Sequence, residues 1–177
     1  MDERQQKVLQ LLDEHGPSLY GHVARLTRCE HVTRDLMQDL FVKLQTVDGF
    51  DQIQDLYAYA WRMATNLAFD WHRRQRIVAR SKDSVVSREI DGSHPLDQVI
   101  QSEQIQQLLG ATAQLNDLAR QVIVMRFMEQ ASYDEIALRL NKKSGYLRSL
   151  CSKSLARLRD LLSEQDAGQQ DRRCGHG

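Results

Sequence analysis

Two segments of the sequence carry several basic residues and no acidic ones, a pattern that could bind the phosphates of a nucleic acid. The first segment covers residues 71–82 and the second covers residues 141–159. Two such segments could contact one polyanion at two places, although a basic segment can also be an ordinary solvated helix face. The cations are Arg73, Arg74, Arg76, Arg80 and Lys82 in the first segment, and Lys142, Lys143, Arg148, Lys153, Arg157 and Arg159 in the second.

Aromatic residues lie within and just before the first basic segment, where they could stack on the bases of single-stranded nucleic acid. They are Tyr57, Tyr59, Trp61 and Trp71. Aromatic residues at helical spacing are more often part of a protein core than of a binding surface. We assign Trp71 to the core and leave Tyr59 and Trp61 open between the two roles.

A third segment, residues 30–55, is acidic and holds only two basic residues, Arg34 and Lys43. Asp35 and Asp39 are four residues apart, which places them on one face of a helix, whereas the leucines at positions 36, 40 and 44 define another face. We therefore expect a helix that packs through its leucines and presents carboxylates to solvent. The acidic residues of the segment are Glu30, Asp35, Asp39, Asp48, Asp51 and Asp55.

The elements that position these residues are predicted to be helices. The chain has 177 residues and only two prolines, which favours an all-α fold in two small helical domains. Apolar spacing predicts one helix that ends near Gly16, another that begins at Pro17, a third through Leu44, a loop over 47–55 and a long helix over about 53–76.

The second half of the chain shows the signals of a helix-turn-helix. Residues 81–95 are rich in Ser, Asp and Gly and predict a linker, which two helices follow, with apolar positions from Leu96 to Leu115 and from Leu118 to Met128. Ser132 and Glu135 form a capping-box pattern that opens a short helix. Asn141 tolerates the left-handed turn that would end this helix, and Ser144 can cap a longer basic one. The polar tail over 164–177 is predicted to be disordered.

The longer basic helix could enter the major groove of DNA and contact base edges. If Leu147, Leu150, Ser154, Leu155 and Leu158 face inward, the residues that face outward are Tyr146, Arg148, Ser149, Ser152 and Lys153. Lys142, Lys143, Arg157 and Arg159 would then contact phosphates. The alternative is the surface helix of a bundle, with Lys and Arg that only confer solubility.

Residues 19–162 resemble bacterial RNA polymerase sigma factors of the sigma-70 family, in the extracytoplasmic-function (ECF) group. The resemblance lies in Asp35-Leu-Met-Gln-Asp-Leu-Phe-Val-Lys-Leu44, in Tyr59-Ala-Trp-Arg-Met-Ala-Thr-Asn-Leu-Ala-Phe-Asp-Trp-His-Arg-Arg74 and in residues 115–162. It implies region 2 over 1–80, a linker over 81–95, region 4 over 96–163 and a tail over 164–177. It also implies a transcription initiation factor that binds core RNA polymerase through the coiled coil of its largest subunit, reads promoter DNA, opens it and catalyses no reaction.

The resemblance assigns residues to three contacts. Those implied for polymerase are Asp35, Leu36, Gln38, Asp39 and Val42. Those implied for the single-stranded minus-10 element are Asp48, Phe50, Asp51, Tyr59, Arg62, Asn66, Arg73 and Arg74. Those implied for the minus-35 duplex are Lys142, Lys143, Tyr146, Arg148, Ser149, Ser152, Lys153 and Arg157. Family behaviour further implies an anti-sigma factor as a partner.

The chain departs from the family pattern at several positions. Gln130 stands where the family often has glycine, and a side chain is less comfortable than glycine in a left-handed conformation. Asn141-Lys142-Lys143 replaces a common Gly-Ile-Ser turn. The minus-35 contacts are therefore the least transferable of the three sets.

Other classes of function have less support in the sequence. A stand-alone helix-turn-helix regulator would not need the acidic helix or the aromatic one. A metal site could use Cys29 with His31 or Cys174 with His176, but neither pair has further ligands at zinc-finger spacing. The remaining histidines, His15, His22, His72 and His94, are expected at the surface.

We expect no cofactor, no small-molecule substrate and no catalytic motif. We find no signal peptide and no apolar run long enough for membrane insertion, and three widely spaced cysteines argue against a disulfide framework, so we expect a cytoplasmic protein.

Overall fold

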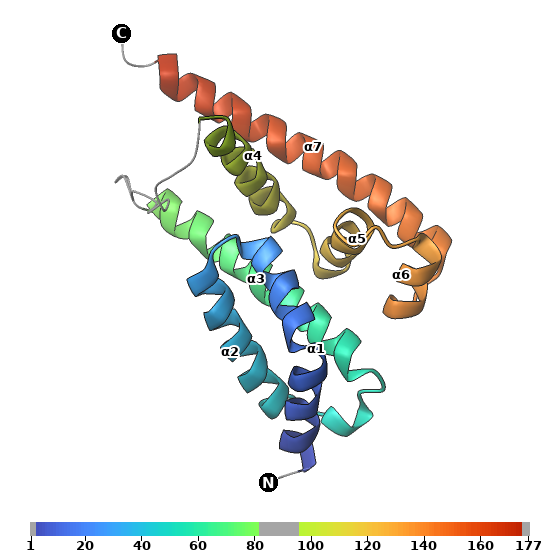
Figure 1. Cartoon of the computed structure of the whole chain (residues 1–177). Coiled ribbons are helices and arrows are strands. Elements are labelled where there is room, and N and C mark those ends of the chain that lie inside the picture. Colours follow the sequence, from blue (N-terminus) through green and yellow to red (C-terminus); the bar gives the residue numbers. More distant parts are fainter. Residues whose placement is uncertain (1–2, 82–95, 175–177) are drawn as a thin grey trace. The chain divides into compact units, whose positions relative to one another are not determined.

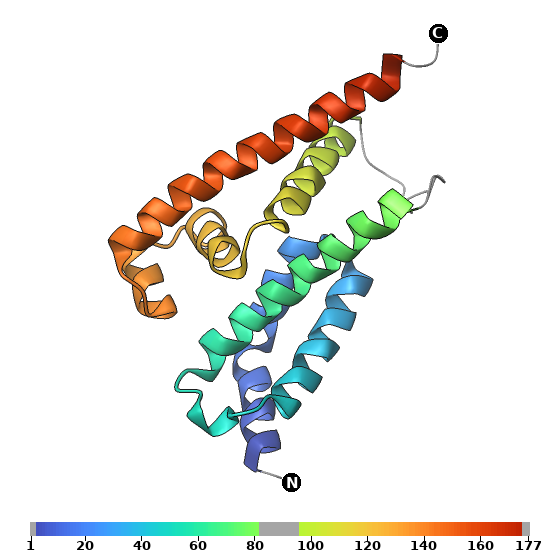
Figure 2. The same ribbon diagram turned by 180° about the vertical axis from the view of Figure 1, so that it is seen from behind.

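The computed structural model describes residues 3–81 and 96–174, and within them it describes side-chain surroundings for residues 3–75, 77 and 103–164. All regular structure in these ranges is helical, as Figures 1 and 2 show, which confirms the predicted all-α class. The elements are α1 (Glu3–Thr27), α2 (Glu30–Thr46), the 3-10 helix η1 (Phe50–Gln52), α3 (Leu56–Ser81), α4 (Leu96–Thr112), α5 (Asp117–Phe127), α6 (Tyr133–Leu140) and α7 (Ser144–Cys174).

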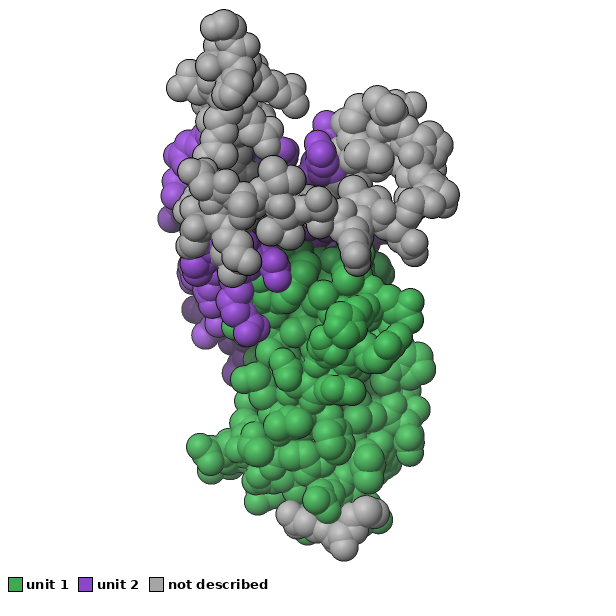
Figure 3. Space-filling model, turned by 90° about the vertical axis from the view of Figure 1, so that its left-hand side faces the viewer, with its two compact units in different colours: residues 1–72 green, residues 73–177 purple. Residues whose placement is uncertain are grey.

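The chain divides into two compact units, residues 1–72 and residues 73–177 (Figure 3). This boundary lies inside α3, so the end of that helix is grouped with the second unit. The sequence instead places region 2 over 1–80 and region 4 over 96–163. Most of the predicted linker, residues 82–95, lies outside the described residues.

The first unit packs α1, α2 and α3 around one apolar core (Figure 1). Each helix contributes side chains at three-and-four spacing, which is the pattern of a helix that buries a single stripe. On α2 this stripe is the predicted set of leucines at positions 36, 40 and 44. The other core residues include Leu19, Val23 and Leu26 from α1 and Ala60, Ala64, Ala68 and Phe69 from α3.

Helix α1 is continuous, so the predicted break at Gly16 and Pro17 is wrong. A proline inside a helix removes one backbone hydrogen bond and usually ends or kinks the helix. Here Leu11 and Leu19 are both buried. They are eight residues apart, which is slightly more than two helical turns, so they lie near the same face of the helix. One core-facing stripe thus runs across Pro17, and burial of both halves against the same core outweighs the local penalty.

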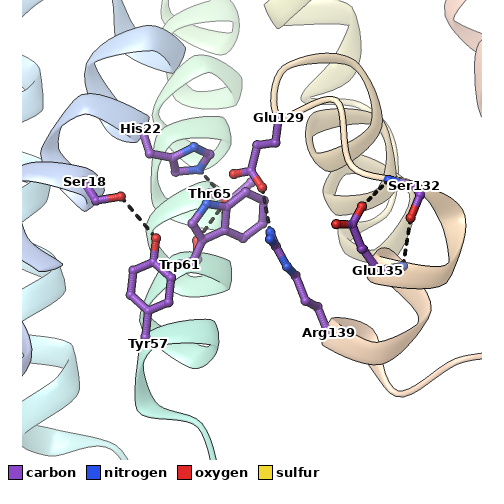
Figure 4. A network of polar contacts seen from close by, with 9 residues as sticks. All are labelled: Ser18, His22, Tyr57, Trp61, Thr65, Glu129, Ser132, Glu135 and Arg139. Atoms are coloured by element: carbon purple, nitrogen blue, oxygen red, sulfur yellow. Dashed lines mark hydrogen bonds and ion pairs between the residues drawn. The ribbon is translucent and has the colours of Figure 1, made fainter.

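Two histidines bind buried polar groups of the first unit, which corrects their expected surface position. His22 is 2% exposed and its Nε2 lies 2.8 Å from Thr65 Oγ1, while its ring lies against Trp61 with centroids 4.4 Å apart (Figure 4). His72 is 4% exposed, and its Nε2 donates to the Leu26 carbonyl over 2.8 Å. Burial, with a smaller contribution from the nearby Arg25 charge, lowers the pKa of His22 to about 3.

The second unit contains the predicted helix-turn-helix in α6 and α7. Ser132 Oγ accepts from the Glu135 amide over 3.2 Å, and Glu135 Oε2 accepts from the Ser132 amide over 2.7 Å, which completes the capping box (Figure 4). Asn141 ends α6 in the left-handed conformation at φ 49°. An ion pair of 2.9 Å between Arg139 and Glu129 joins α6 to the segment before it. Local capping therefore defines both ends of the short helix.

Helix α7 differs from the sequence prediction in two respects. It continues to Cys174, whereas residues from 164 onward are predicted to be disordered. Each residue added to an existing helix gains one backbone hydrogen bond without the cost of nucleating a new helix. A polar segment that directly follows α7 can therefore continue it as helix. The second difference concerns the buried face of α7. Leu155 was expected to face inward but is 39% exposed, whereas Cys151, which was not expected there, is buried.

Candidate functional site

Four of the five predicted polymerase-contact residues are exposed on α2. Asp35, Gln38, Asp39 and Val42 are accessible to solvent, and 57% of Val42 is exposed although it is apolar. Leu36 is only 4% exposed and packs in the core, so a direct contact by Leu36 is not available in this structure. We call the exposed set, residues 35, 38, 39 and 42, the α2 face.

An apolar groove between α1 and α2 adjoins the α2 face. It has a volume of about 730 Å³, and Gln38 and Val42 belong both to its lining and to the α2 face. The groove was not predicted from the sequence, although Phe41 and Val42 lie two and three residues after Asp39 and give the helix more apolar surface than one core stripe needs. The lining residues are Leu12, Gly16, Pro17, Tyr20, Arg34, Met37, Gln38, Phe41 and Val42.

The loop between α2 and α3 has a defined shape. Gly49 adopts φ 69°, which glycine reaches without the strain that a side chain would cause, and η1 follows at once. Asp48 and Asp51 are exposed, as a DNA contact requires, but Phe50 is only 4% exposed. The guanidinium of Arg4 covers the Phe50 ring at 5.0 Å and donates to the Gln45 carbonyl over 2.9 Å. Phe50 thus anchors the loop in the core of this structure, and its assignment as a base contact stays a prediction that its burial does not favour.

Along α3, the predicted minus-10 residues form an exposed or half-buried face. Tyr59, Arg62 and Asn66 are half-buried, and the Arg62 guanidinium lies 5.8 Å from the centre of the Tyr59 ring. Arg73 and Arg74 are exposed near the end of the helix. Trp61, left open by the sequence, is 5% exposed and belongs to the core, whereas Trp71, assigned to the core, is only half-buried.

All eight predicted minus-35 residues are exposed in the helix-turn-helix. Two of them stand in the turn between α6 and α7, and the other six lie within the first half of α7. The buried stripe of α7 is formed by Leu147, Cys151, Ser154 and Leu158, and the six predicted contact residues of this helix lie outside that stripe. The exposed set is Lys142, Lys143, Tyr146, Arg148, Ser149, Ser152, Lys153 and Arg157.

One aromatic residue beside this surface was not identified from the sequence. Tyr133, the first residue of α6, has the guanidinium carbons of Arg126 and Arg148 over its ring, at 5.2 and 5.4 Å from the centroid. Such distances allow an electrostatic attraction between cation and ring face. No sequence signal marks the contact, because Tyr133 and Arg148 belong to different helices and meet only through the packing of α6 on α7.

Family comparisons decide the identity of the two units. Residues 11–77 match the model of sigma-70 region 2, and residues 111–160 match the model of sigma-70, region 4. The chain belongs to the sigma-70 family. Sigma factors are transcription initiation factors and not enzymes, and the resemblance seen in the sequence is thereby confirmed.

Curated relatives of this sigma factor carry ECF names. The ECF RNA polymerase sigma factor SigW of Bacillus subtilis strain 168 is 25% identical over 164 residues, which cover 87% of this chain and 88% of that protein. SigX of the same strain is 24% identical over 179 residues, with 94% and 92% covered. A solved structure of the sigma factor RpoE in complex with the anti-sigma factor NepR from Bartonella quintana is 21% identical, with a TM-score of 0.48 and 89% and 98% of the two chains covered.

The described residues also bear on membrane insertion and metal binding. None of the helices in that part of the sigma factor combines the length and apolar character needed to cross a bilayer. Within the same residues, no three His, Cys, Asp or Glu side chains gather closely enough to hold a metal ion. Cys29 is exposed, and the side chains of Cys174 and His176 lie outside the described residues.

Proposed function

We propose that this sigma factor binds core RNA polymerase and directs it to promoters by contacting a minus-35 duplex with α7 and a minus-10 single strand with α3 and the loop before it. The observation that carries the proposal is the exposure of all eight predicted minus-35 residues on a capped helix-turn-helix. Because the protein acts with polymerase on chromosomal DNA, we also propose a cytoplasmic location.

The α2 face supports polymerase binding by its combination of charge and apolar surface. Asp35 and Asp39 can pair with cations of a partner, and the adjoining groove can receive an apolar side chain. Aromatic or aliphatic anchors in a pocket, bordered by charged pairs, are the usual composition of a protein interface. An anti-sigma factor that covered the same face would exclude polymerase, and we propose this competition as the route of inhibition.

The minus-10 contact needs a base to leave the duplex, which costs a few kcal/mol. Stacking on an aromatic side chain returns about 1–3 kcal/mol per base, and the half-buried Tyr59 of α3 can supply it. Arg73 and Arg74, four turns further along α3, can hold the phosphates of the same strand. Asp48 and Asp51 remain available in the loop that Phe50 anchors.

The minus-35 contact follows the geometry of a recognition helix. Arg148 and Lys153 can donate to guanine O6 and N7, and Ser149 and Ser152 can donate to or accept from base edges. Lys142 and Lys143 precede the helix in the turn, where they can contact the phosphate backbone. The contacts with base edges distinguish one DNA sequence from another, whereas the phosphate contacts only orient the protein on the duplex.

The test is a pull-down of core RNA polymerase with the purified full-length chain, followed by sequencing of the retained DNA. We expect polymerase binding and enrichment of two spaced DNA elements. DNA retained without polymerase would instead indicate a stand-alone regulator and contradict the proposal.

Charge reversal of the α2 face tests the polymerase contact directly. Asp35→Lys with Asp39→Lys should abolish capture of core polymerase while the helical circular dichroism is unchanged. The matched control is Asp160→Lys with Glu164→Lys, which reverses the same number of exposed acids at the same four-residue spacing on α7. Capture retained by the α2 variant, or lost equally by the control, would remove the assignment.

A further inference from the structure

The Tyr133 side chain connects three helices of the second unit. Arg126 comes from α5 and Arg148 from α7, and both guanidinium carbons lie over the ring that α6 supplies. Arg126 is itself fixed, because it donates to the Ala131 carbonyl over 3.0 Å just before the capping serine of α6. The ring therefore occupies a place determined by the packing of the helix-turn-helix and not by the rotamer of one exposed side chain.

Tyr133 also lies beside the Cys151 thiol of α7. This thiol raises the pKa of Tyr133, and only 1% of Cys151 is exposed. Cys151 follows Arg148 by three residues on α7, so both positions lie on the side of α7 that meets α6. The Tyr133 ring therefore meets α7 at the Arg148 guanidinium, next to the buried position of Cys151.

Arg148 is exposed, and among the described residues its guanidinium has neither an ion pair nor a hydrogen bond. Contact with a ring face uses none of the five N–H donors of a guanidinium, so all of them stay available for DNA. A long side chain that is already ordered loses less rotamer entropy when it binds than one that moves freely. Contact with the Tyr133 ring restrains the Arg148 side chain in this way.

We propose that Tyr133 is a positioning residue for promoter recognition, whose ring holds the Arg148 guanidinium in place for the minus-35 duplex. This inference rests on the proposed function, because it requires Arg148 to contact promoter DNA. Tyr133 itself makes no contact with a base in this role. It acts through Arg148 and raises the affinity for the promoter by reducing the freedom of that side chain.

The experiment measures the affinity of holoenzyme, formed from core polymerase and the full chain, for the promoter found by the selection above. Tyr133→Leu removes the ring, and we expect roughly twofold to fivefold weaker binding, the range for a cation–ring contact at an exposed site. Tyr133→Phe keeps the ring and should bind like the native protein. Leu138→Ala, at an α6 position with 84% exposure, is the matched control and should change nothing.

A double-mutant cycle separates positioning from a merely structural role. In the Arg148→Ala background, Tyr133→Leu should cause no further loss of affinity, because the residue through which it acts is absent. A cooperative thermal unfolding transition shows that each variant is folded before its affinity is compared. Should Tyr133→Leu fail to fold, Tyr133→Met, with an unbranched side chain that favours helix, replaces it.

The outcomes distinguish failure of this inference from failure of the proposed function. If Arg148→Ala leaves promoter affinity unchanged, Arg148 does not contact the promoter, and both the contact and its positioning are overturned. If Arg148→Ala weakens binding but Tyr133→Leu has no effect, adds its effect independently or tightens binding, only the positioning role is overturned. Tighter binding would mean that the ring competes with DNA for the arginine.

Discussion

The first unit is held by side-chain hydrogen bonds between distant parts of the chain, whereas those of the helix-turn-helix join near neighbours. His22 and Thr65 are 43 residues apart, and His72 and the Leu26 carbonyl are 46 apart. In the second unit, the capping box spans three residues and the Arg139–Glu129 ion pair spans ten. The difference predicts that a core substitution in the first unit disturbs contacts throughout that unit, whereas substitutions on the exposed face of α7 change the stability little.

The largest effect is expected from Leu36→Ala in the first unit. Because Leu36 is 4% exposed, truncation leaves a cavity and should lower the free energy of unfolding by about 2–5 kcal/mol. Urea unfolding followed by tryptophan fluorescence measures it, since both tryptophans lie on α3 within residues 1–72. The control is Val42→Ala on the same helix, where 57% exposure predicts a change below about 0.5 kcal/mol. Equal effects would contradict the burial of Leu36.

A pH-dependent loss of stability should also arise in the first unit. The folded state keeps His22 neutral with a pKa of about 3, whereas the unfolded chain binds a proton near pH 6.5. The unfolded state therefore gains protons first, so the stability is complete above pH 6.5 and falls as the pH drops toward 3, with a slope of about 1.4 kcal/mol per pH unit. The free energy of unfolding, measured by urea titration at a series of pH values, should fall less steeply with decreasing pH for His22→Leu than for the native protein. An unchanged slope would mean that His22 is charged in the folded protein.

A smaller effect, which concerns function and leaves stability nearly unchanged, is expected in the second unit. Arg148→Ala and Lys153→Ala should each weaken promoter binding of the holoenzyme by about 1–3 kcal/mol if they contact bases. Thermal unfolding should change little, because both side chains are exposed and the contact of Arg148 with the Tyr133 ring contributes at most about 1 kcal/mol. Equal weakening on promoter and on random duplex would make them phosphate contacts, and a large loss of stability would abolish the contrast between the two units.

The smallest effect concerns the turn before the capping box. Gln130 adopts φ 57°, a left-handed conformation that a side chain resists and glycine accepts. Gln130→Gly should raise the free energy of unfolding of the second unit by up to about 1 kcal/mol, part of the relief being offset by the greater freedom of glycine in the unfolded chain. Thermal denaturation followed by circular dichroism measures it. A decrease would show that contacts of the Gln130 side chain outweigh the strain.

The same contrast explains which features could be predicted from the sequence. The capping box and the left-handed Asn141 were predictable because their residue types and spacing act within a few positions. The break at Pro17 was predicted wrongly because a local preference was overruled by packing. Burial of His22 and His72 could not be inferred, since their partners are more than 40 residues away.

The same distinction between local and long-range determinants applies to the candidate contact residues. Exposure of the minus-35 set follows from helical periodicity on α7. Leu36 and Phe50 were assigned by resemblance, but both are apolar and the core takes them. The groove between α1 and α2 and the stacking of Arg148 on Tyr133 both depend on how helices meet, which one sequence does not reveal.

The long-range bonds of the first unit also order events during synthesis. All their partners have been made once the ribosome has added His72, and Tyr133, where α6 begins, follows 61 residues later. At roughly 5–20 residues per second, the helix-turn-helix is made several seconds after this point. We therefore expect region 2 to close its core on the nascent chain while the helix-turn-helix has yet to be translated.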